Sequence, residues 1–132
     1  MKIIYKMSHP KFKKFIYIGS TQNLEKRIEW HRQDCFNKNS SGYNTKIYKF
    51  IKENNINFNE IEFEMICEAT ENVLKTEAYF IKKFDSIKNG LNTKLPWIKK
   101  IEKPQEFRCP HCNIRFSQDI YLQNHINQFH NH

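Results

Sequence analysis

Four metal-ligating residues near the C-terminus constrain the fold of this chain more than any other feature of its sequence. Two cysteines are separated by two residues and two histidines by four, with twelve residues between the pairs: Cys109, Cys112, His125 and His130. Zinc prefers four sulfur and nitrogen ligands in a tetrahedron, and this spacing lets a tight turn supply two thiolates and a helix two imidazoles. Because four protein ligands leave no open position, the spacing predicts a structural Zn2+ ion.

Apolar residues around these ligands complete a small folding unit. Phe107 lies two residues before the first cysteine, Phe116 four after the second, and Leu122 three before the first histidine. In ligands, spacing and apolar positions this segment resembles a two-cysteine, two-histidine zinc finger of ββα fold. A unit this small cannot fold on its apolar core alone, so zinc binding would supply its folding energy. His111 and His132 lie outside the spacing and are not expected to bind the metal.

The resemblance places base-facing side chains of the finger at Gln118, Tyr121 and Asn124. Amide side chains can bind adenine edges in the major groove of DNA. Yet residues 101–132 hold three basic and three acidic residues, and one finger covers only about three base pairs. The finger therefore cannot specify a DNA site alone. Three roles stay open: an auxiliary DNA contact, a protein contact and a structural cap.

The remaining cysteines, Cys35 and Cys67, stand alone in the sequence. A metal site together with two lone thiols indicates a reducing compartment, either cytoplasm or nucleus. No apolar run approaches the roughly 18 residues that a membrane span needs, and the first residues lack the apolar core of a secretion signal. We therefore expect a soluble intracellular protein that is not secreted and has no membrane partner.

Positive charge is concentrated in the first part of the chain. The 132 residues include 22 Lys and Arg against 14 Asp and Glu, a formal net charge of +8. Residues 1–52 hold 12 basic and 3 acidic residues, whereas residues 53–100 hold 7 and 8. A positive surface attracts a nucleic-acid backbone through counterion release, which makes DNA the predicted partner. A lysine-rich solubilising surface is the alternative explanation of the charge.

Hydrophobic periodicity predicts an α+β domain, an α/β sandwich, over residues 1–95. Strands are expected near residues 2–7, 15–19 and 61–67, and helices near 23–34, 45–54 and 71–84. The first two strands would form a hairpin, and the order of elements favours a three-stranded antiparallel sheet flanked by helices. Residues 96–106 contain two prolines and several charges and would link this domain to the finger at residues 107–132.

Helical spacing places Glu77 inside or beside an apolar stripe that includes Val73, Ile81 and Phe84. A carboxylate in apolar surroundings needs a partner, because leaving it unpaired costs several kcal/mol. A hydrated magnesium ion bound by one carboxylate would be such a partner. A glutamate at the edge of the stripe that reaches solvent is the alternative.

Arg27 and His31 are four residues apart and therefore lie on one side of the predicted first helix. Arginine is a planar donor suited to phosphate, and histidine can accept or pass a proton near neutral pH. A solvated basic helix face would show the same spacing. Tyr5 and Tyr17 each lie in an apolar strand segment, where tyrosines are usually packing residues.

In content, order and spacing, these residues together resemble the GIY-YIG endonuclease family over residues 1–95. The pattern comprises Ile3-Ile4-Tyr5, Tyr17-Ile18-Gly19, Ser20-Thr21, Arg27, His31, Glu77 and Gly90-Leu91-Asn92. The first triplet begins with Ile3 where the family has glycine. That glycine contributes backbone shape rather than chemistry, so only local strand geometry is expected to differ.

The resemblance implies a metal-dependent DNA endonuclease that hydrolyses phosphodiester bonds to 5′-phosphate and 3′-hydroxyl ends. Tyr5 would be the general base for the attacking water, with Tyr17 and His31 assisting proton handling and phosphate positioning. Arg27 would orient and neutralise the scissile phosphate. Glu77 would hold one catalytic Mg2+ (or Mn2+).

By the same resemblance Asn92 would brace the site. The zinc finger would assist DNA binding, as suits a homing or mobile-element nuclease or a structure-specific one, and no small-molecule substrate is expected. The alternative function is a non-catalytic DNA-binding adaptor whose nuclease-like domain only grips the backbone. Retention of every side chain with an implied chemical role favours the enzyme.

Overall fold

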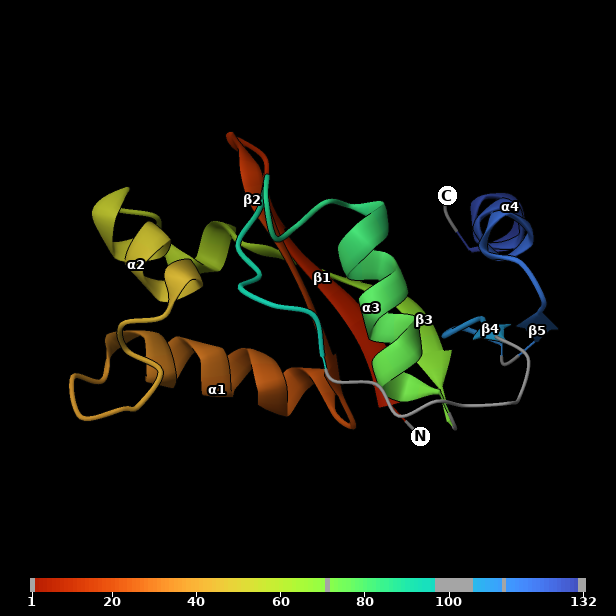
Figure 1. The fold of residues 1–132 in the computed structure, drawn as a ribbon, viewed down its shortest axis with the longest axis horizontal. Helices are drawn as coiled ribbons and strands as arrows, with labels where there is room; N and C mark the ends of the chain where they lie inside the picture. The colour runs from red at the N-terminus through yellow and green to blue at the C-terminus, as the bar shows by residue number, and fades with distance from the viewer. Residues whose placement is uncertain (1, 71, 97–105, 113, 131–132) are drawn as a thin grey trace.

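The structure is a computed structural model that describes residues 2–70, 72–96, 106–112 and 114–130. Its elements follow the order β1 (Lys2–His9), β2 (Phe12–Thr21), α1 (Leu24–Phe36), α2 (Lys46–Glu53), the 3-10 helix η1 (Phe58–Glu60), β3 (Glu62–Ala69), α3 (Val73–Lys83), β4 (Phe107–Arg108), β5 (Arg115–Phe116) and α4 (Asp119–Phe129) (Figure 1). Except for its two end residues, the linker predicted at residues 96–106 lies outside the described residues. Among the residues described, no helix is both long and apolar enough to cross a membrane.

The strands form one antiparallel sheet in the order β2-β1-β3-β4-β5. The first three strands are the three-stranded antiparallel sheet that the sequence predicts, with β1 between its neighbours. At the β3 edge the sheet continues into the short β4–β5 hairpin, where Glu68 pairs with Arg108. The register between β1 and β3 shifts between Ile4 and Tyr5. This irregularity lies within the triplet that lacks the family's glycine.

The β1–β2 hairpin is longer than the sequence suggests. Its turn is confined to Pro10 and Lys11, because His9 pairs with Phe12 and the Lys11 amide donates to His9 Nδ1 at 3.1 Å. Phe12 continues the strand because its ring packs partly buried against the core. The predicted loop over residues 8–14 is therefore a tight turn between two extended strands.

Neighbouring residues of β1 point to opposite sides of the sheet and divide the core into two clusters. Tyr5 packs on one side with Ile47 and Ile51 of α2, whereas Ile4 packs on the other with Phe80 of α3. The result is the predicted sandwich, with α1 and α2 covering one side of the sheet and α3 lying across the other (Figure 1).

The elements β4, β5 and α4, here called the C-terminal module, pack against β3 and α3 (Figure 1). The Phe107 ring lies edge-on to Tyr79 and Phe80, with ring centroids 5.1 and 6.1 Å apart. Buried Asp119 accepts a hydrogen bond from Tyr79 Oη at 3.2 Å and pairs with the Lys83 ammonium. The module therefore shares a core with the rest of the chain, a contact for which the sequence gives no signal.

We predict that Phe107→Ala lowers the free energy of unfolding by about 3–5 kcal/mol, because it empties part of a core shared by the module and α3. Ile120→Ala is the matched control on the same module, since that side chain is 61% exposed and its loss should change stability by at most about 0.5 kcal/mol. Urea denaturation with saturating zinc, followed by circular dichroism, measures both. Equal midpoints for the two variants would contradict the packing described.

Candidate active site and metal centre

A pocket of about 350 Å³ beside β2 collects several of the predicted site residues. Tyr17 of β2, His31 of α1, Glu77 of α3 and Asn92, which follows α3, all line it. Tyr5 does not line this pocket but contacts His31 and Tyr17 from within the core. Arg27 lines an adjoining pocket together with Lys2 and Lys26. Residues that span most of residues 1–95 in sequence thus meet where α1 and α3 approach the same strand.

The Tyr5 ring lies directly over Gly19, its partner across the β1–β2 ladder. A β-carbon built on Gly19 would come within 2.5 Å of the Tyr5 hydroxyl oxygen, so no side chain fits there. The same hydroxyl is 2.8 Å from His31 Nε2. The glycine that ends the second triplet is therefore required by the place of the tyrosine that ends the first.

His31 is 2% exposed and lies between two tyrosine hydroxyls. Its Nε2 is bonded to Tyr5 as above, and its Nδ1 lies 2.7 Å from the Tyr48 hydroxyl. Burial, and secondarily the positive charge of Arg27, lower the pKa of His31 to about 4. At neutral pH the imidazole is therefore uncharged and carries one N–H for its two hydroxyl partners.

The acidic and phenolic groups of the site are shifted towards their protonated forms. Burial raises the pKa of both Tyr5 and Tyr17, and the Arg27 charge only partly opposes it. Burial also raises the pKa of Glu77, against the effects of Lys2, a hydrogen bond from Ser20, and Arg27. Tyr5 can therefore act as a base only if its own proton leaves as another arrives.

Arg27 and the Lys2 and Lys26 side chains give the mouth of the site a positive edge. The Arg27 guanidinium stacks on the Trp30 ring, 4.8 Å from its centroid. Trp30 is 49% exposed and borders both pockets. Nothing in the sequence singles out Trp30, because a tryptophan on an amphipathic helix normally indicates packing and its exposure depends on the tertiary fold.

Asn92 lines the pocket, and its side chain also makes hydrogen bonds with the backbone of β2. Its Nδ2 donates to the Ile18 carbonyl at 3.0 Å, and its Oδ1 accepts from the Ile18 amide at 2.9 Å and from Ser86 Oγ at 2.7 Å. One buried side chain thereby satisfies both backbone groups of Ile18, which follows Tyr17 on β2. This geometry suits the bracing role expected for Asn92.

Tyr48 of α2 is a second residue of the site that the sequence does not single out. It is 3% exposed, and its hydroxyl oxygen lies 2.7 Å from His31 Nδ1. Burial, and secondarily the negative charge of Asp34, raise the pKa of Tyr48. Nothing in the pattern of α2 separates Tyr48 from an ordinary core residue.

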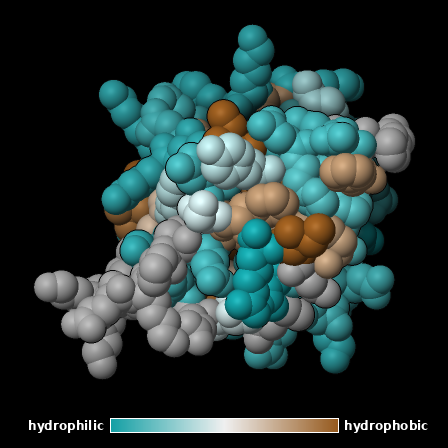
Figure 2. Space-filling model, turned by 90° about the vertical axis from the view of Figure 1, so that its right-hand side faces the viewer, coloured by the Kyte–Doolittle hydropathy of each residue, from teal (hydrophilic) through white to brown (hydrophobic). Residues whose placement is uncertain are grey.

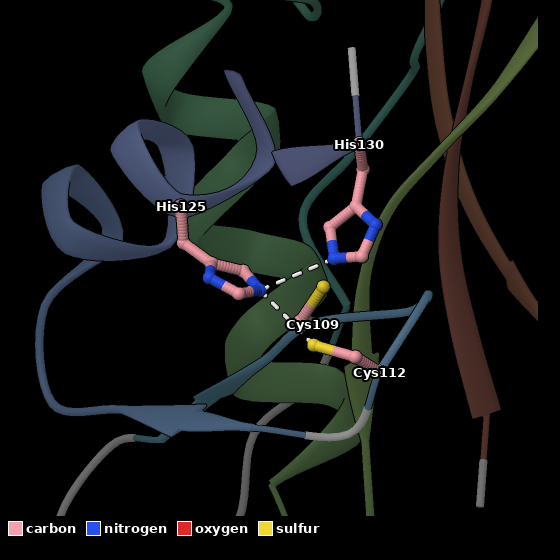
Figure 3. A group of neighbouring side chains, drawn as sticks. All are labelled: Cys109, Cys112, His125 and His130. Carbon is pink, nitrogen blue, oxygen red and sulfur yellow. Dashed lines mark hydrogen bonds between the residues drawn. The ribbon is translucent and has the colours of Figure 1, made fainter. Parts of the chain in front are cut away.

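The four predicted zinc ligands gather in the C-terminal module (Figure 3). Their ligand atoms all lie within 4.8 Å of one another. His125 Nε2 is 3.0 Å from Cys112 Sγ and 3.3 Å from His130 Nε2. Two sulfur and two nitrogen atoms at this separation fit tetrahedral Zn2+.

The other histidines of the module and its predicted DNA-facing residues lie apart from this cluster. His111 is exposed and does not belong to it, and His132 lies outside the described residues. Gln118, Tyr121 and Asn124 are all exposed at the start and along one side of α4. None of these three lines the pocket beside β2.

We predict that His31 makes stability depend on pH between about 4 and 6.5. The unfolded chain takes up a proton near the ordinary pKa of 6.5, whereas the folded protein resists protonation of His31 down to about pH 4. The free energy of unfolding should therefore fall as pH drops through this window, by up to about 3 kcal/mol. Denaturation curves of wild type and His31→Gln at several pH values isolate this contribution. An identical pH slope in both would contradict it.

Known proteins of similar sequence or fold identify the family to which this arrangement belongs. No curated protein matches the chain. Among solved structures, a mutant of the catalytic domain of the intron endonuclease I-TevI has a similar fold, with a TM-score of 0.60, 22% sequence identity and coverage of 75% of this chain and 100% of that one. This likeness shows the fold alone. The sequence also matches the GIY-YIG catalytic domain over residues 1–92, most of its length, and the chain therefore belongs to the GIY-YIG family of nucleases.

Proposed function

We propose that this nuclease is a metal-dependent DNA endonuclease whose active site is the pocket beside β2. The observation that carries the proposal is the 2.8 Å contact of Tyr5 Oη with His31 Nε2, next to a pocket lined by Tyr17 and Glu77. Acid–base groups, a cationic donor and a carboxylate meet there. These are the parts that phosphodiester hydrolysis requires.

In the proposed reaction Tyr5 takes a proton from the attacking water and passes its own proton to His31. Both groups are uncharged at neutral pH, so the site enters the reaction without a buried phenolate or imidazolium. Arg27 orients the scissile phosphate and neutralises charge that develops on its oxygens. Tyr17, held by the braced edge of β2, positions the phosphate and helps in proton handling.

Glu77 is the residue that would hold the divalent ion, Mg2+ or Mn2+. Its carboxylate is half-buried, lines the pocket, and has a pKa raised by burial. Mg2+ commonly binds one or two carboxylates together with substrate phosphate and water, which suits a single glutamate at an open pocket. A bound ion would stabilise charge on the phosphoryl group and on the departing 3′ oxygen, in keeping with 5′-phosphate and 3′-hydroxyl products.

The C-terminal module would be a zinc finger that assists DNA binding and also covers the apolar core that it shares with α3. Gln118, Tyr121 and Asn124 are exposed, as DNA contact requires. Figure 2 presents the side of the molecule that carries α4, where mainly hydrophilic side chains surround a few apolar ones. The exposed residues of α4 include Ile120. Amide, aromatic and aliphatic groups together suit base edges and thymine methyl groups.

Domain boundaries, compartment and setting follow from the same proposal. We assign residues 1–95 to the nuclease domain, 96–106 to a linker and 107–132 to the finger. The free thiols of Cys35 and Cys67, both buried, suit a reducing intracellular setting. A homing, mobile-element or structure-specific nuclease fits this combination of modules. The non-catalytic adaptor is disfavoured because every side chain of the proposed mechanism is retained.

A supercoiled plasmid and a panel of branched DNA substrates, each with Mg2+, test the enzyme. We expect wild type to cut with metal, and Tyr5→Phe and Glu77→Gln each to lose at least about 100-fold in rate, because they remove a general base or a metal ligand. Tyr43→Phe is the matched control, since the Tyr43 ring lies against Lys52 outside the pocket. Absence of metal-dependent cleavage of every substrate by wild type would refute the proposal.

DNA affinity tests the finger separately from catalysis. We expect Tyr121→Ala combined with Asn124→Ala to weaken duplex binding by about 10-fold, roughly 1.4 kcal/mol, while zinc content stays at one ion per chain. Asn59→Ala, an equally neutral exposed amide on η1, is the control. Fluorescence anisotropy measures affinity, and atomic absorption measures zinc. Unaltered affinity in the double variant would leave a protein contact or a structural cap as the role of the finger.

A further inference from the structure

Trp30 is a large aromatic residue that stands exposed between two pockets of the proposed active site. It is 49% exposed, although it directly precedes buried His31 on α1. Its side chain borders the pocket beside β2 and also the adjoining pocket of about 600 Å³ that Lys2, Lys26 and Arg27 line. A single exposed apolar residue is ordinary on a protein surface. Its place between two pockets of a proposed active site, however, indicates a ligand that contacts the ring.

Two neighbours on α1 hold the Trp30 ring in place. The Arg27 guanidinium lies over the ring, 4.8 Å from its centroid, and the His31 ring lies edge-on to it, with centroids 5.2 Å apart. Arg27 lines the adjoining pocket but not the pocket beside β2, so the guanidinium does not cover the part of the indole that faces that second pocket. A ring already fixed in this way loses little conformational freedom when a flat ligand stacks on it.

The charges next to Trp30 indicate the chemistry of that ligand. Three cations, Lys2, Lys26 and Arg27, line the adjoining pocket, and every other described residue that lines it is uncharged. Cationic side chains beside an aromatic ring bind single-stranded nucleic acid, because the cations attract the backbone while a base stacks on the ring. A nucleotide whose base is not paired fits both parts of this surface.

We propose that Trp30 and the adjoining pocket form a subsite for one unpaired nucleotide next to the scissile phosphate, with its base stacked on the indole and its other phosphate near Lys2 and Lys26. This inference rests on the proposed function and narrows its substrate class. A base inside a paired duplex already stacks on both faces and must leave the stack to reach Trp30. The cost of doing so is comparable to what one stacking contact returns, and it is smallest for a mismatched or single-stranded base. The enzyme therefore prefers DNA that is bulged, mismatched or branched at the cut.

A different role for the indole would be only to hold Arg27 through the cation–π contact. That role requires no base in the DNA, so Trp30→Ala would then weaken cleavage of every substrate alike. Removing the base from the unpaired nucleotide, while keeping its sugar and phosphate, therefore separates the two roles.

The fluorescence of Trp30 tests the subsite without any cleavage. Trp30 and Trp97 are the two tryptophans of the chain, so Trp97→Phe leaves Trp30 as the only one. The probes are two duplexes without added Mg2+, one with a single bulged nucleotide and one with the same bulge lacking its base, and anisotropy confirms that each is bound. We expect the base-bearing bulge to quench Trp30 fluorescence and the abasic bulge to leave it nearly unchanged. Equal quenching by the two bound duplexes, or none by either, would overturn the subsite.

Cleavage of the same two duplexes with Mg2+ measures the substrate preference. On the base-bearing bulge we expect Trp30→Ala to raise KM by about 10-fold, and Trp30→Phe, which keeps an aromatic ring, by at most about threefold. On the abasic bulge the KM of Trp30→Ala should stay within about threefold of wild type, because no base is present to stack. An equal loss for Trp30→Ala on both bulges would overturn the proposal.

Phe36→Ala is the matched control for these measurements. Phe36 is another exposed aromatic residue of α1, at 53% exposure, and it lines neither pocket. This variant should cut both duplexes as wild type does. If wild type binds the duplexes and cuts neither of them nor any other DNA, the proposed function fails, and the fluorescence alone decides whether the subsite exists.

Discussion

The contact of Tyr5 with Gly19 on one side and His31 on the other is the constraint on which the rest of the structure depends. The tyrosine ring occupies the space above Gly19 and reaches a helix that follows the hairpin in sequence. Its hydroxyl joins the central strand to α1 through the 2.8 Å contact with His31. A larger residue at position 19 would push the phenol away from the histidine. The two sequence triplets of the family are thus two halves of one packing arrangement.

The fold was predictable where local pattern decides it and unpredictable where distant surfaces meet. Short apolar runs on either side of a turn indicated β1 and β2, alternation indicated β3, and apolar stripes indicated the helices, because these patterns reflect which sides of each element are buried. The pairing of Arg108 with Glu68 and the seating of Asp119 on α3 had no such signal. Such contacts depend on complementary surfaces far apart in sequence. The hairpin turn was narrower than expected because Phe12 finds a place in the core.

The residues of the candidate site likewise divide into those that the sequence indicates and those that only the fold reveals. Glu77 was identified because a carboxylate beside an apolar stripe departs from the pattern that packing alone would produce. Arg27 and His31 fit an ordinary basic helix face and were identified only through the resemblance to the family. Tyr48 obeys that pattern, since a buried tyrosine on a helix fits a core position, and its hydroxyl contact with His31 exists only in the folded protein. Trp30 shows the reverse case, an apolar residue left exposed beside Arg27. A sequence indicates a functional side chain more readily where a packed core would not hold it than where it fits an ordinary core position.

The central claim is that this one pocket holds the scissile phosphate. An experimental structure of Glu77→Gln bound to an oligonucleotide that the wild type cuts tests it most directly. The account predicts a phosphate in hydrogen-bond contact with Arg27, at about 2.7–3.2 Å, and a water within the same reach of the Tyr5 hydroxyl. A DNA backbone that binds elsewhere, with no phosphate reaching Arg27 or Tyr17, would contradict it.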